Sequence, residues 1–462
     1  MTHRFHPSIL REYDIRGIVG QTLDADDAWA VGNAFAARLR RDGGRKVAVS
    51  HDGRLSSPML EAALVEGLVA AGCDVVRLGL AATPMLYYAE VSAQDVQGGI
   101  QVTGSHNPGD HNGFKIVMRS HPFFGEDIRA LSASARQGKA MVQRRGAIEQ
   151  RDVLGAYIER LLEALCGIDP ARLAALRIGW DTGNGAAGPT LATLVARLPG
   201  EHHLLFTEVN GHFPNHHPDP TVETNLADLR RLVATKQLDF GVAFDGDGDR
   251  IGVVDGRGRI IHGDQLLMIY AEDLLRERPG ATVIADVKAS QAVFDRVAEL
   301  GGRPLMWKTG HSLIKSKMRE TGALLAGEMT GHVFFADNYY GFDDALYAAL
   351  RLITASVRLG KSVTELCSAL PVMINTPELR FQVDESRKFA VIEEVAARLS
   401  ATGAQVNEID GVRVTTPDGW WLLRASNTQD GLVARAESSD QPGLARLLAQ
   451  IDAQLAASGV SR

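Results

Sequence analysis

Short apolar runs alternate with helical patterns along most of the chain. Three stretches share one form, in which an apolar run ends near an aspartate and leads through small polar residues to a helical pattern; they are residues 47–53, 178–183 and 283–287. Helical patterns include residues 57–71 and 190–197. Strands that alternate with helices favour βαβ units and mixed sheets with functional loops at strand ends. The pattern therefore predicts three similar α/β domains.

The pattern changes near Pro371. The residues that follow include an apolar run at 420–423, a polar loop at 424–431 and an apparent strand at 432–435, which indicate a smaller α+β domain. The predicted domains are residues 1–151, 152–256, 257–370 and 371–462. These boundaries do not depend on whether the similarity of the first three domains reflects duplication or coincidence.

A loop in the first predicted domain places Ser105 between apolar runs at 99–102 and 114–117, which are predicted strands. The loop is rich in Gly, Asn and Pro, and these turn formers favour an ordered, exposed loop over a helix. His106, His111 and Lys115 lie close by in the sequence. A serine held in such a loop can act as a chemical carrier; the alternative is a polar hairpin in which the serine only caps local backbone.

Composition narrows the class of protein. The chain has 462 residues, with 45% hydrophobic and 23% charged residues, as expected of a globular protein with roughly three or four domains. The formal net charge of -7 argues against a nucleic-acid or anionic-membrane partner. The 3 cysteines show no CxxC spacing, and we find no apolar segment typical of a signal peptide or a membrane span. We therefore expect a cytoplasmic protein.

Three aspartates in the second domain alternate with glycine. Asp245, Asp247 and Asp249 can bring their oxygens onto one cation, and hard oxygen ligands favour Mg²⁺, Mn²⁺ or Ca²⁺. The segment does not fit a calcium EF-hand, because the sixth position is Arg250 and the twelfth is Gly256. An Asp-Gly hairpin turn is the structural alternative. Without a cation the close carboxylates would raise one another's pKa, so we favour a metal site.

Two further loops carry candidate binding groups. Arg424, Ser426, Asn427 and Thr428 could form a phosphate cradle, although a solvated turn would have the same composition. Glu328 and His332 are four residues apart, which on a helix would resemble half a zinc site, but Gly327 and Gly331 favour a loop, in which the two side chains would suit a sugar's hydroxyls. Further candidate basic residues are Arg16, Lys288, Lys308 and His311. Each of them alone would be interpreted as an ordinary surface residue.

Taken together, the loops resemble the α-D-phosphohexomutase superfamily, most closely its bacterial phosphomannomutase/phosphoglucomutase branch. The resemblance runs in order from Tyr13-Asp14-Ile15-Arg16-Gly17 to Arg424-Ala425-Ser426-Asn427-Thr428. It implies a heart-shaped enzyme of four domains around a central cleft, with a phosphoserine at Ser105. It also implies Mg²⁺ held by Ser105, Asp245, Asp247 and Asp249. The catalytic residues that it implies are Ser105, Arg16, Lys115, His311 and Arg250. The substrate-binding residues that it implies are Tyr13, Lys288, Glu328, Thr330, His332, Arg424, Ser426, Asn427 and Thr428.

The resemblance implies an isomerase that interconverts hexose 1-phosphates and hexose 6-phosphates, with glucose 1,6-bisphosphate as activator and intermediate. We expect a monomer whose partners are hexose phosphates. The residue at Met329 favours glucose and mannose over glucosamine phosphates, and Thr330 replaces the serine that is usual in the family. The base that accepts the hydroxyl proton is open among His311, Lys115 and Arg16.

Three other functions remain open from the sequence. A phosphoglucosamine mutase would share the chemistry, and a metal-dependent phosphatase would pass the phosphoryl group to water. A sugar-phosphate-binding protein without turnover is the third, but Ser105 and the three aspartates argue against it.

Overall fold

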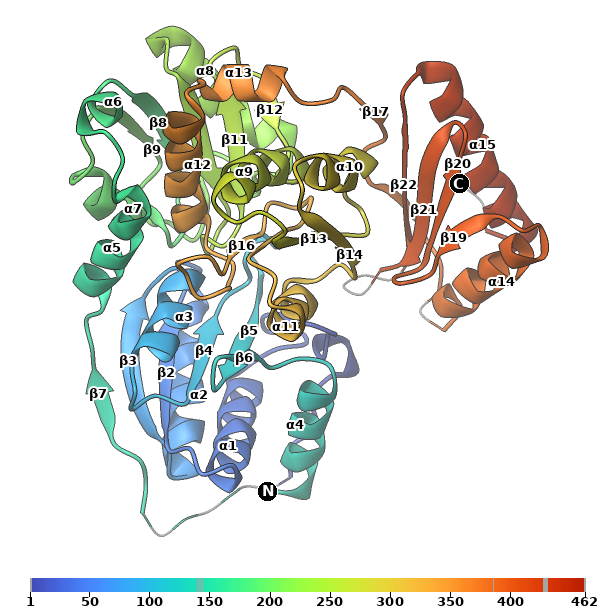
Figure 1. The fold of residues 1–462 in the computed structure, drawn as a ribbon. Coiled ribbons are helices and arrows are strands. Elements are labelled where there is room, and N and C mark those ends of the chain that lie inside the picture. Colours follow the sequence, from blue (N-terminus) through green and yellow to red (C-terminus); the bar gives the residue numbers. More distant parts are fainter. Residues whose placement is uncertain are drawn as a thin grey trace.

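The computed structural model describes residues 2–138, 140, 142, 144–384, 386–426 and 431–460. Its four sheets follow one another along the sequence, and the fourth lies to one side of the other three (Figure 1). The predicted fold class is confirmed, with three α/β domains and a smaller C-terminal α+β domain. The domain boundaries remain predictions.

The first sheet has the order β1-β5-β4-β2-β3-β7, and β6 pairs with β5. Its strands are β1 (Ile15–Ile18), β2 (Lys46–His51), β3 (Asp74–Leu80), β4 (Gly98–Val102), β5 (His111–Met118), β6 (His121–Pro122) and β7 (Ile148–Gln150). The helices of this region are η1 (Pro7–Ile9), α1 (Ala25–Arg41), α2 (Ser57–Ala70), α3 (Thr83–Ser92) and α4 (Glu126–Gln137).

The second sheet has the order β12-β11-β10-β8-β9. Its strands are β8 (Arg177–Asp181), β9 (Glu201–Leu205), β10 (Phe240–Phe244), β11 (Ile251–Asp255) and β12 (Ile260–Ile261). The helices are α5 (Leu154–Leu162), η2 (Glu163–Leu165), α6 (Pro170–Ala174), α7 (Gly188–Val195), η3 (Glu223–Leu226) and α8 (Ala227–Lys236).

The third sheet has the order β14-β13-β15-β16. Its strands are β13 (Thr282–Asp286), β14 (Arg303–Trp307), β15 (Leu325–Gly327) and β16 (Val333–Phe335). The helices are α9 (Gly263–Glu277), α10 (Gln291–Glu299), α11 (His311–Thr321), α12 (Ala345–Leu359) and α13 (Val363–Ser368).

The fourth sheet is antiparallel, with the order β17-β22-β21-β20-β19 and β18 paired with β22. Its strands are β17 (Ile374–Asn375), β18 (Leu379–Phe381), β19 (Gln405–Asn407), β20 (Val412–Thr416), β21 (Gly419–Ala425) and β22 (Leu432–Ser438). The helices α14 (Lys388–Ala401) and α15 (Gln441–Ala457) complete this C-terminal domain.

The first three sheets share one topology. The strands predicted from the aspartate-ending runs are β2, β8 and β13, and each pairs in parallel with a neighbour on both sides. One neighbour then continues into an antiparallel hairpin, namely β4–β5, β10–β11 or β15–β16. Three of the candidate loops found in the sequence, those with Ser105, with Asp245 and with Glu328, are the turns of these hairpins. The repeated sheet therefore presents each loop from an equivalent position.

Apolar packing separates the C-terminal domain from the rest. One buried cluster runs through the first three domains, from Ala48 to Leu366. The C-terminal domain has its own cluster around Trp421 and Leu447. A small group of three buried side chains, Val287, Trp420 and Leu422, joins it to the third domain. Within the described chain, no helix combines the length and the apolar character needed to cross a bilayer.

Candidate active site

Ser105 lies in the β4–β5 turn and faces the second domain. Its Oγ donates to Asp245 Oδ2 at 2.8 Å, so the serine loop and the acidic loop meet although they lie far apart in sequence. The expectation of an exposed loop around Ser105 is wrong at the serine itself, which is only 1% exposed. Its backbone is left-handed, with φ +50°, a conformation that costs a non-glycine residue energy and needs support from its surroundings.

Arg54 supplies that support. Its guanidinium is buried and donates to the carbonyl oxygens of Ser105 at 2.7 Å, Asn107 at 2.6 Å, Pro108 at 2.5 Å and His111 at 2.9 Å. A single side chain therefore satisfies four carbonyls of the turn and holds the backbone at the buried Ser105 in place, while the tip of the loop at residues 108–110 remains exposed. The sequence analysis missed Arg54, because nothing in its local pattern distinguishes it from a surface arginine.

Aspartates at the ends of central strands hold two of the three functional turns. Asp52, directly after β2, accepts hydrogen bonds from Thr103 Oγ1 at 2.7 Å and from Gly104 N at 3.2 Å. Asp286, the last residue of β13, accepts one from Met329 N at 3.2 Å in the β15–β16 turn. Two of the aspartates in the repeated sequence pattern, Asp52 and Asp286, thus hold the turns that contain Ser105 and Met329.

The three aspartates of the acidic loop are fully buried. Asp247 Oδ2 accepts from Thr83 Oγ1 at 2.5 Å and from Lys115 Nζ at 2.8 Å, and the same ammonium also contacts Asp249. Burial and the charges of Asp247 and Asp249 raise the pKa of Asp245 well above its ordinary value. Burial disfavours the charge of Lys115, but the carboxylates outweigh burial and raise its pKa.

One glycine of the acidic loop has a packing role. A Cβ on Gly246 would lie 2.5 Å from the carbonyl oxygen of Ser105, so only glycine lets the two loops approach this closely. The alternation of aspartate and glycine therefore serves both the clustering of carboxylates and the contact between domains.

The acidic loop fits a divalent cation. Oxygens of Asp245, Asp247 and Asp249 lie within 4.8 Å of one another, and Asp247 Oδ1 is buried without a hydrogen-bond partner among the described residues. Lys115 offsets one of the three negative charges, and the remaining two match a divalent ion. Carboxylate oxygens are the ligands that hard cations prefer. The structure thus contains an acidic cluster that can hold a metal.

A second group, Asp249, His332 and Asp343, has similar spacing but fits a metal poorly. Arg250 Nε donates to His332 Nε2 at 3.0 Å, so this nitrogen carries a lone pair and the ring proton belongs on Nδ1. That nitrogen lies 3.1 Å from Asp343 Oδ2. A protonated nitrogen cannot ligate a metal, and we therefore interpret this group as a histidine oriented by Arg250 beside two carboxyl groups rather than as a metal site.

A cleft of about 590 Å³ passes between residues of all four domains. Most of the predicted site residues line it, and these are Tyr13, Arg250, Lys288, His311, Glu328, Thr330, His332, Arg424 and Ser426. Asn427 and Thr428 lie outside the described residues. Arg16 lies beside the serine loop, where it donates to Asn107 Oδ1 at 2.6 Å and to Asp14 Oδ2 at 2.5 Å. Ser105, Lys115 and the aspartates are buried next to this cleft rather than in its wall.

The end of the cleft formed by the third and C-terminal domains is held by polar contacts. Glu328 Oε1 accepts from Gly310 N at 2.7 Å, and burial raises the pKa of this carboxyl. Arg424 donates to both oxygens of Asp410 at 3.1 and 3.2 Å, and Asp410 also accepts from Thr309 N at 3.0 Å. Asp410 therefore orients the Arg424 guanidinium within the C-terminal domain and also bonds across the boundary to the third domain.

Two half-buried histidines that line the cleft differ in their surroundings from ordinary surface histidines. Burial and the positive charge of Lys315 lower the pKa of His311 well below its ordinary value, so its imidazole is neutral. Burial and the charge of Arg250 lower the pKa of His106 to about 3, and His106 Nδ1 lies 3.0 Å from Asp219 Oδ2. The sequence analysis singled out His311, but it gave His106 no role and did not identify Asp343.

Comparisons with known proteins agree with this arrangement. The chain matches four domain families described as phosphoglucomutase/phosphomannomutase: alpha/beta/alpha domain I over residues 7–140, domain II over 155–258, domain III over 262–373 and the C-terminal domain over 378–454. It is 44% identical over 440 residues to a phosphomannomutase/phosphoglucomutase of Pseudomonas aeruginosa, covering 95% of this chain and 94% of the relative. It is 43% identical to a phosphoglucomutase of Neisseria gonorrhoeae, with 95% of each chain covered. A crystal structure of a phosphoglucomutase/phosphomannomutase family protein from Burkholderia thailandensis superposes with a TM-score of 0.91 at 44% identity, covering 98% of both chains.

Proposed function

The chain belongs to the phosphoglucomutase/phosphomannomutase family, and we propose that it interconverts the 1-phosphates and 6-phosphates of glucose and mannose through a phosphoserine at Ser105. The observation that carries this proposal is the contact between Ser105 Oγ and Asp245 Oδ2 at 2.8 Å, beside a cleft that all four domains line. The proposed nucleophile Ser105, the three aspartates and the cation Lys115 then lie together beside this cleft.

The phosphoryl group travels in two steps. Phospho-Ser105 loses its phosphoryl group to the free 6-hydroxyl of a hexose 1-phosphate, so that one P–O bond breaks, one forms, and the hydroxyl proton leaves. The resulting 1,6-bisphosphate turns end for end in the cleft and returns its 1-phosphate to Ser105, which leaves the hexose 6-phosphate. Transfer of this kind depends mainly on positioning and charge neutralisation.

Ser105, Asp245, Asp247 and Asp249 would hold Mg²⁺ as the divalent ion. When bound, the ion would neutralise charge on the phosphoryl group. Lys115 and Arg16 supply positive charge from the first domain. Arg250 supplies a further positive charge from the wall of the cleft. Arg54 and Asp52 keep the serine hydroxyl directed at this site.

Two imidazoles are candidates for the proton acceptor. Lys115 and Arg16 keep their protons, because the aspartates raise the pKa of Lys115 and a guanidinium does not deprotonate in proteins. Burial keeps His311 neutral, and His332 Nε2 carries a lone pair. The base is therefore sought among His311 and His332.

The far side of the cleft would select the sugar and grip the phosphate that is not reacting. Glu328, Thr330 and His332 would contact the hydroxyls, while Tyr13, Lys288 and the loop with Arg424, Ser426, Asn427 and Thr428 would bind the distal phosphate. Asp410 would share the Arg424 guanidinium with that phosphate. We further propose glucose 1,6-bisphosphate as activator, a monomeric state and a cytoplasmic location.

Phosphorus NMR tests the reaction directly. Purified protein with Mg²⁺ and a trace of glucose 1,6-bisphosphate is given glucose 1-phosphate or mannose 1-phosphate in separate samples. Signals of the 6-phosphates are expected from both sugars. Orthophosphate as the product would mean a phosphatase, and turnover of glucosamine 1-phosphate alone would mean a phosphoglucosamine mutase. No reaction with any of the three sugars would leave a binding protein.

A further inference from the structure

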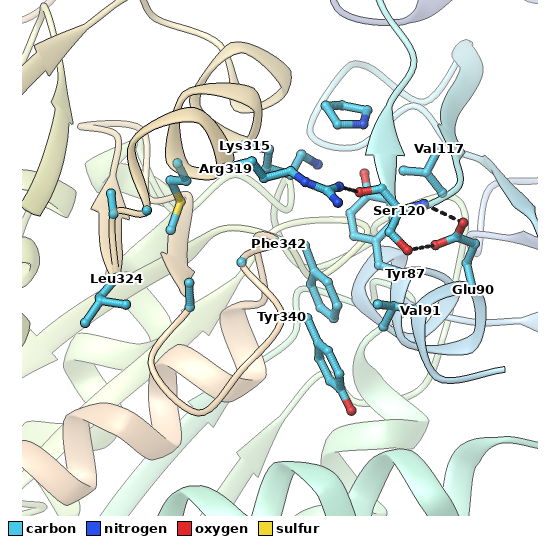
Figure 2. Close-up of a pocket in the computed structure, with 16 residues that line it drawn as sticks. Tyr87, Glu90, Val91, Val117, Ser120, Lys315, Arg319, Leu324, Tyr340 and Phe342 are labelled. Atoms are coloured by element: carbon cyan, nitrogen blue, oxygen red, sulfur yellow. Dashed lines mark hydrogen bonds between the residues drawn. The ribbon is translucent and has the colours of Figure 1, made fainter. Parts of the chain in front are cut away.

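A second cavity, of about 280 Å³, lies where the first and third domains meet. It shares no lining residue with the large cleft. Helix α3 and the β5–β6 connection form one wall, and helix α11 with the segment after β16 forms the other (Figure 2). The cavity thus belongs to neither the serine loop nor the sugar side of the active site.

Aromatic rings give the cavity a flat apolar wall. The rings of Tyr340 and Phe342 are nearly parallel, at an interplanar angle of 7° with centroids 5.8 Å apart. Tyr87 faces Phe342 from the first domain, with the two centroids 5.5 Å apart. Tyr340 is 38% exposed, whereas Tyr87 and Phe342 are buried, so the aromatic wall runs inward from the protein surface. Such a wall suits a planar, largely apolar ligand.

The cavity wall carries two cationic side chains, Lys315 and Arg319, and one carboxyl group, Glu90. Glu90 is already engaged, because its two oxygens accept from Ser120 N at 2.7 Å and from Ser120 Oγ at 3.0 Å. Lys315 is paired with Asp343 at 2.9 Å. Arg319 reaches across from α11 to the carbonyl oxygen of Ser120 (Figure 2) and makes no ion pair with any residue of the described chain. One guanidinium with unused donors therefore faces an aromatic cavity.

We propose that this cavity binds a small aromatic carboxylate, with its ring against Phe342 and Tyr340 and its carboxylate on Arg319. The volume of about 280 Å³ lies just below the range for drug-sized ligand sites, roughly 300–1,000 Å³, and suits one ring system rather than a peptide. A guanidinium binds a planar carboxylate through two parallel hydrogen bonds, which gives the site its preference for an anion.

The cavity is linked to the active site through Lys315. This lysine lies in the cavity wall, with its ammonium 4.3 Å from the centroid of the Tyr87 ring. Its partner Asp343 places Oδ2 3.1 Å from His332 Nδ1 and 3.5 Å from His311 Nδ1. A ligand that packs against Lys315 also bridges the domains that carry Ser105 and these histidines. Binding therefore changes turnover without competing with the sugar phosphate.

Calorimetric titration with 2-naphthoate tests the site. The expected dissociation constant is on the order of 0.1 mM, as is ordinary for a ligand of this size. Saturating glucose 1-phosphate should leave that constant unchanged, and neutral 2-naphthamide should bind at least about tenfold more weakly. In the mutase assay, 2-naphthoate should lower kcat and leave the KM for glucose 1-phosphate unchanged.

Variants locate the binding. Arg319→Gln should weaken 2-naphthoate binding about tenfold, and Val91→Phe, which fills the cavity from α3, should abolish it. Arg276→Gln is the matched control, because Arg276 also lies in the last turn of a helix but outside the cavity. The proposal is overturned if 2-naphthoate does not bind, if Arg319→Gln binds as tightly as the parent, or if glucose 1-phosphate displaces the ligand. Because calorimetry needs no turnover, these results are independent of the proposed mutase activity.

Discussion

The three-domain body and the C-terminal domain are held in place by different forces. One apolar cluster runs through the body, whereas the C-terminal domain meets the body at a small cluster of three buried and two partly buried apolar side chains and at several polar contacts. Arg413 donates to Val287 O at 2.6 Å and to Ala289 O at 2.8 Å, and Glu437 accepts from Ser290 Oγ at 2.9 Å. Hydrogen bonds exchange with water at a small net cost, about 1 kcal/mol each, whereas opening an apolar core costs far more.

This difference matches the two phosphates of the proposed intermediate. The body fixes the reacting end, where Ser105 and the aspartates must meet within a hydrogen-bond distance. In the proposed mechanism the C-terminal domain would bind the other end and release it when the bisphosphate turns. In this proposal, apolar burial holds the three-domain body in place, whereas polar contacts hold the C-terminal domain and allow it to move.

Removal of the nucleophile is the strongest test of the fixed end. Ser105→Ala should reduce turnover by about a thousandfold or more, because among the described residues no other hydroxyl lies in its position beside Asp245. The melting temperature should stay close to that of the parent, since only one oxygen is lost. A variant that retains near-normal turnover would end the phosphoserine proposal.

The clamp on the serine loop comes next. Arg54→Lys should lower kcat by roughly tenfold to a hundredfold, because an ammonium cannot serve the four carbonyls that Arg54 holds. The rate of Ser105 phosphorylation by glucose 1,6-bisphosphate, followed by mass spectrometry, should fall with it. If melting temperature falls while phosphorylation and kcat do not, Arg54 has only a structural role.

The acidic loop should respond to both substitution and metal removal. Asp247→Asn should weaken Mg²⁺ binding and lower kcat together by about tenfold or more, because a ligand charge is lost. Titration of chelator-treated protein with Mg²⁺ measures both quantities. The metal assignment would be contradicted if neither chelation nor added Mg²⁺ changed the rate of the parent enzyme.

Arg413→Lys addresses the movable domain and is the counterpart of Arg54→Lys. Arg413 is as deeply buried and also donates to carbonyls, but it does so across the boundary with the C-terminal domain. We expect KM for glucose 1-phosphate to rise about threefold to tenfold, with a smaller change in kcat. Equal kcat losses in the two variants would erase the proposed distinction between body and C-terminal domain.

The smallest effect is expected at the sugar loop. Thr330→Ser keeps the hydroxyl and removes one methyl group, so KM should change by no more than about threefold. Steady-state kinetics with glucose 1-phosphate and mannose 1-phosphate measure the change. A loss of turnover beyond tenfold would mean that the methyl group positions the loop.

Features that depend only on neighbouring residues in the sequence were predicted correctly. Turn formers around Ser105 and the alternation of aspartate with glycine report local conformation, and strands β2, β8 and β13 follow from their apolar runs. Burial of Ser105 did not follow, because it depends on Arg54 and on the second domain. Asp343 was missed for the same reason, since its partners Lys315 and His332 meet it only in the folded chain.

The shared sheet topology has an evolutionary consequence. Each of the first three domains has a hairpin turn, and in the proposed mechanism these turns supply the nucleophile, the metal-binding acids and the sugar-contacting pair from nearly the same framework. Substitutions confined to one turn leave strand register and core intact. A lineage can therefore exchange sugar preference in the β15–β16 turn while inheriting the phosphoryl-transfer apparatus unchanged.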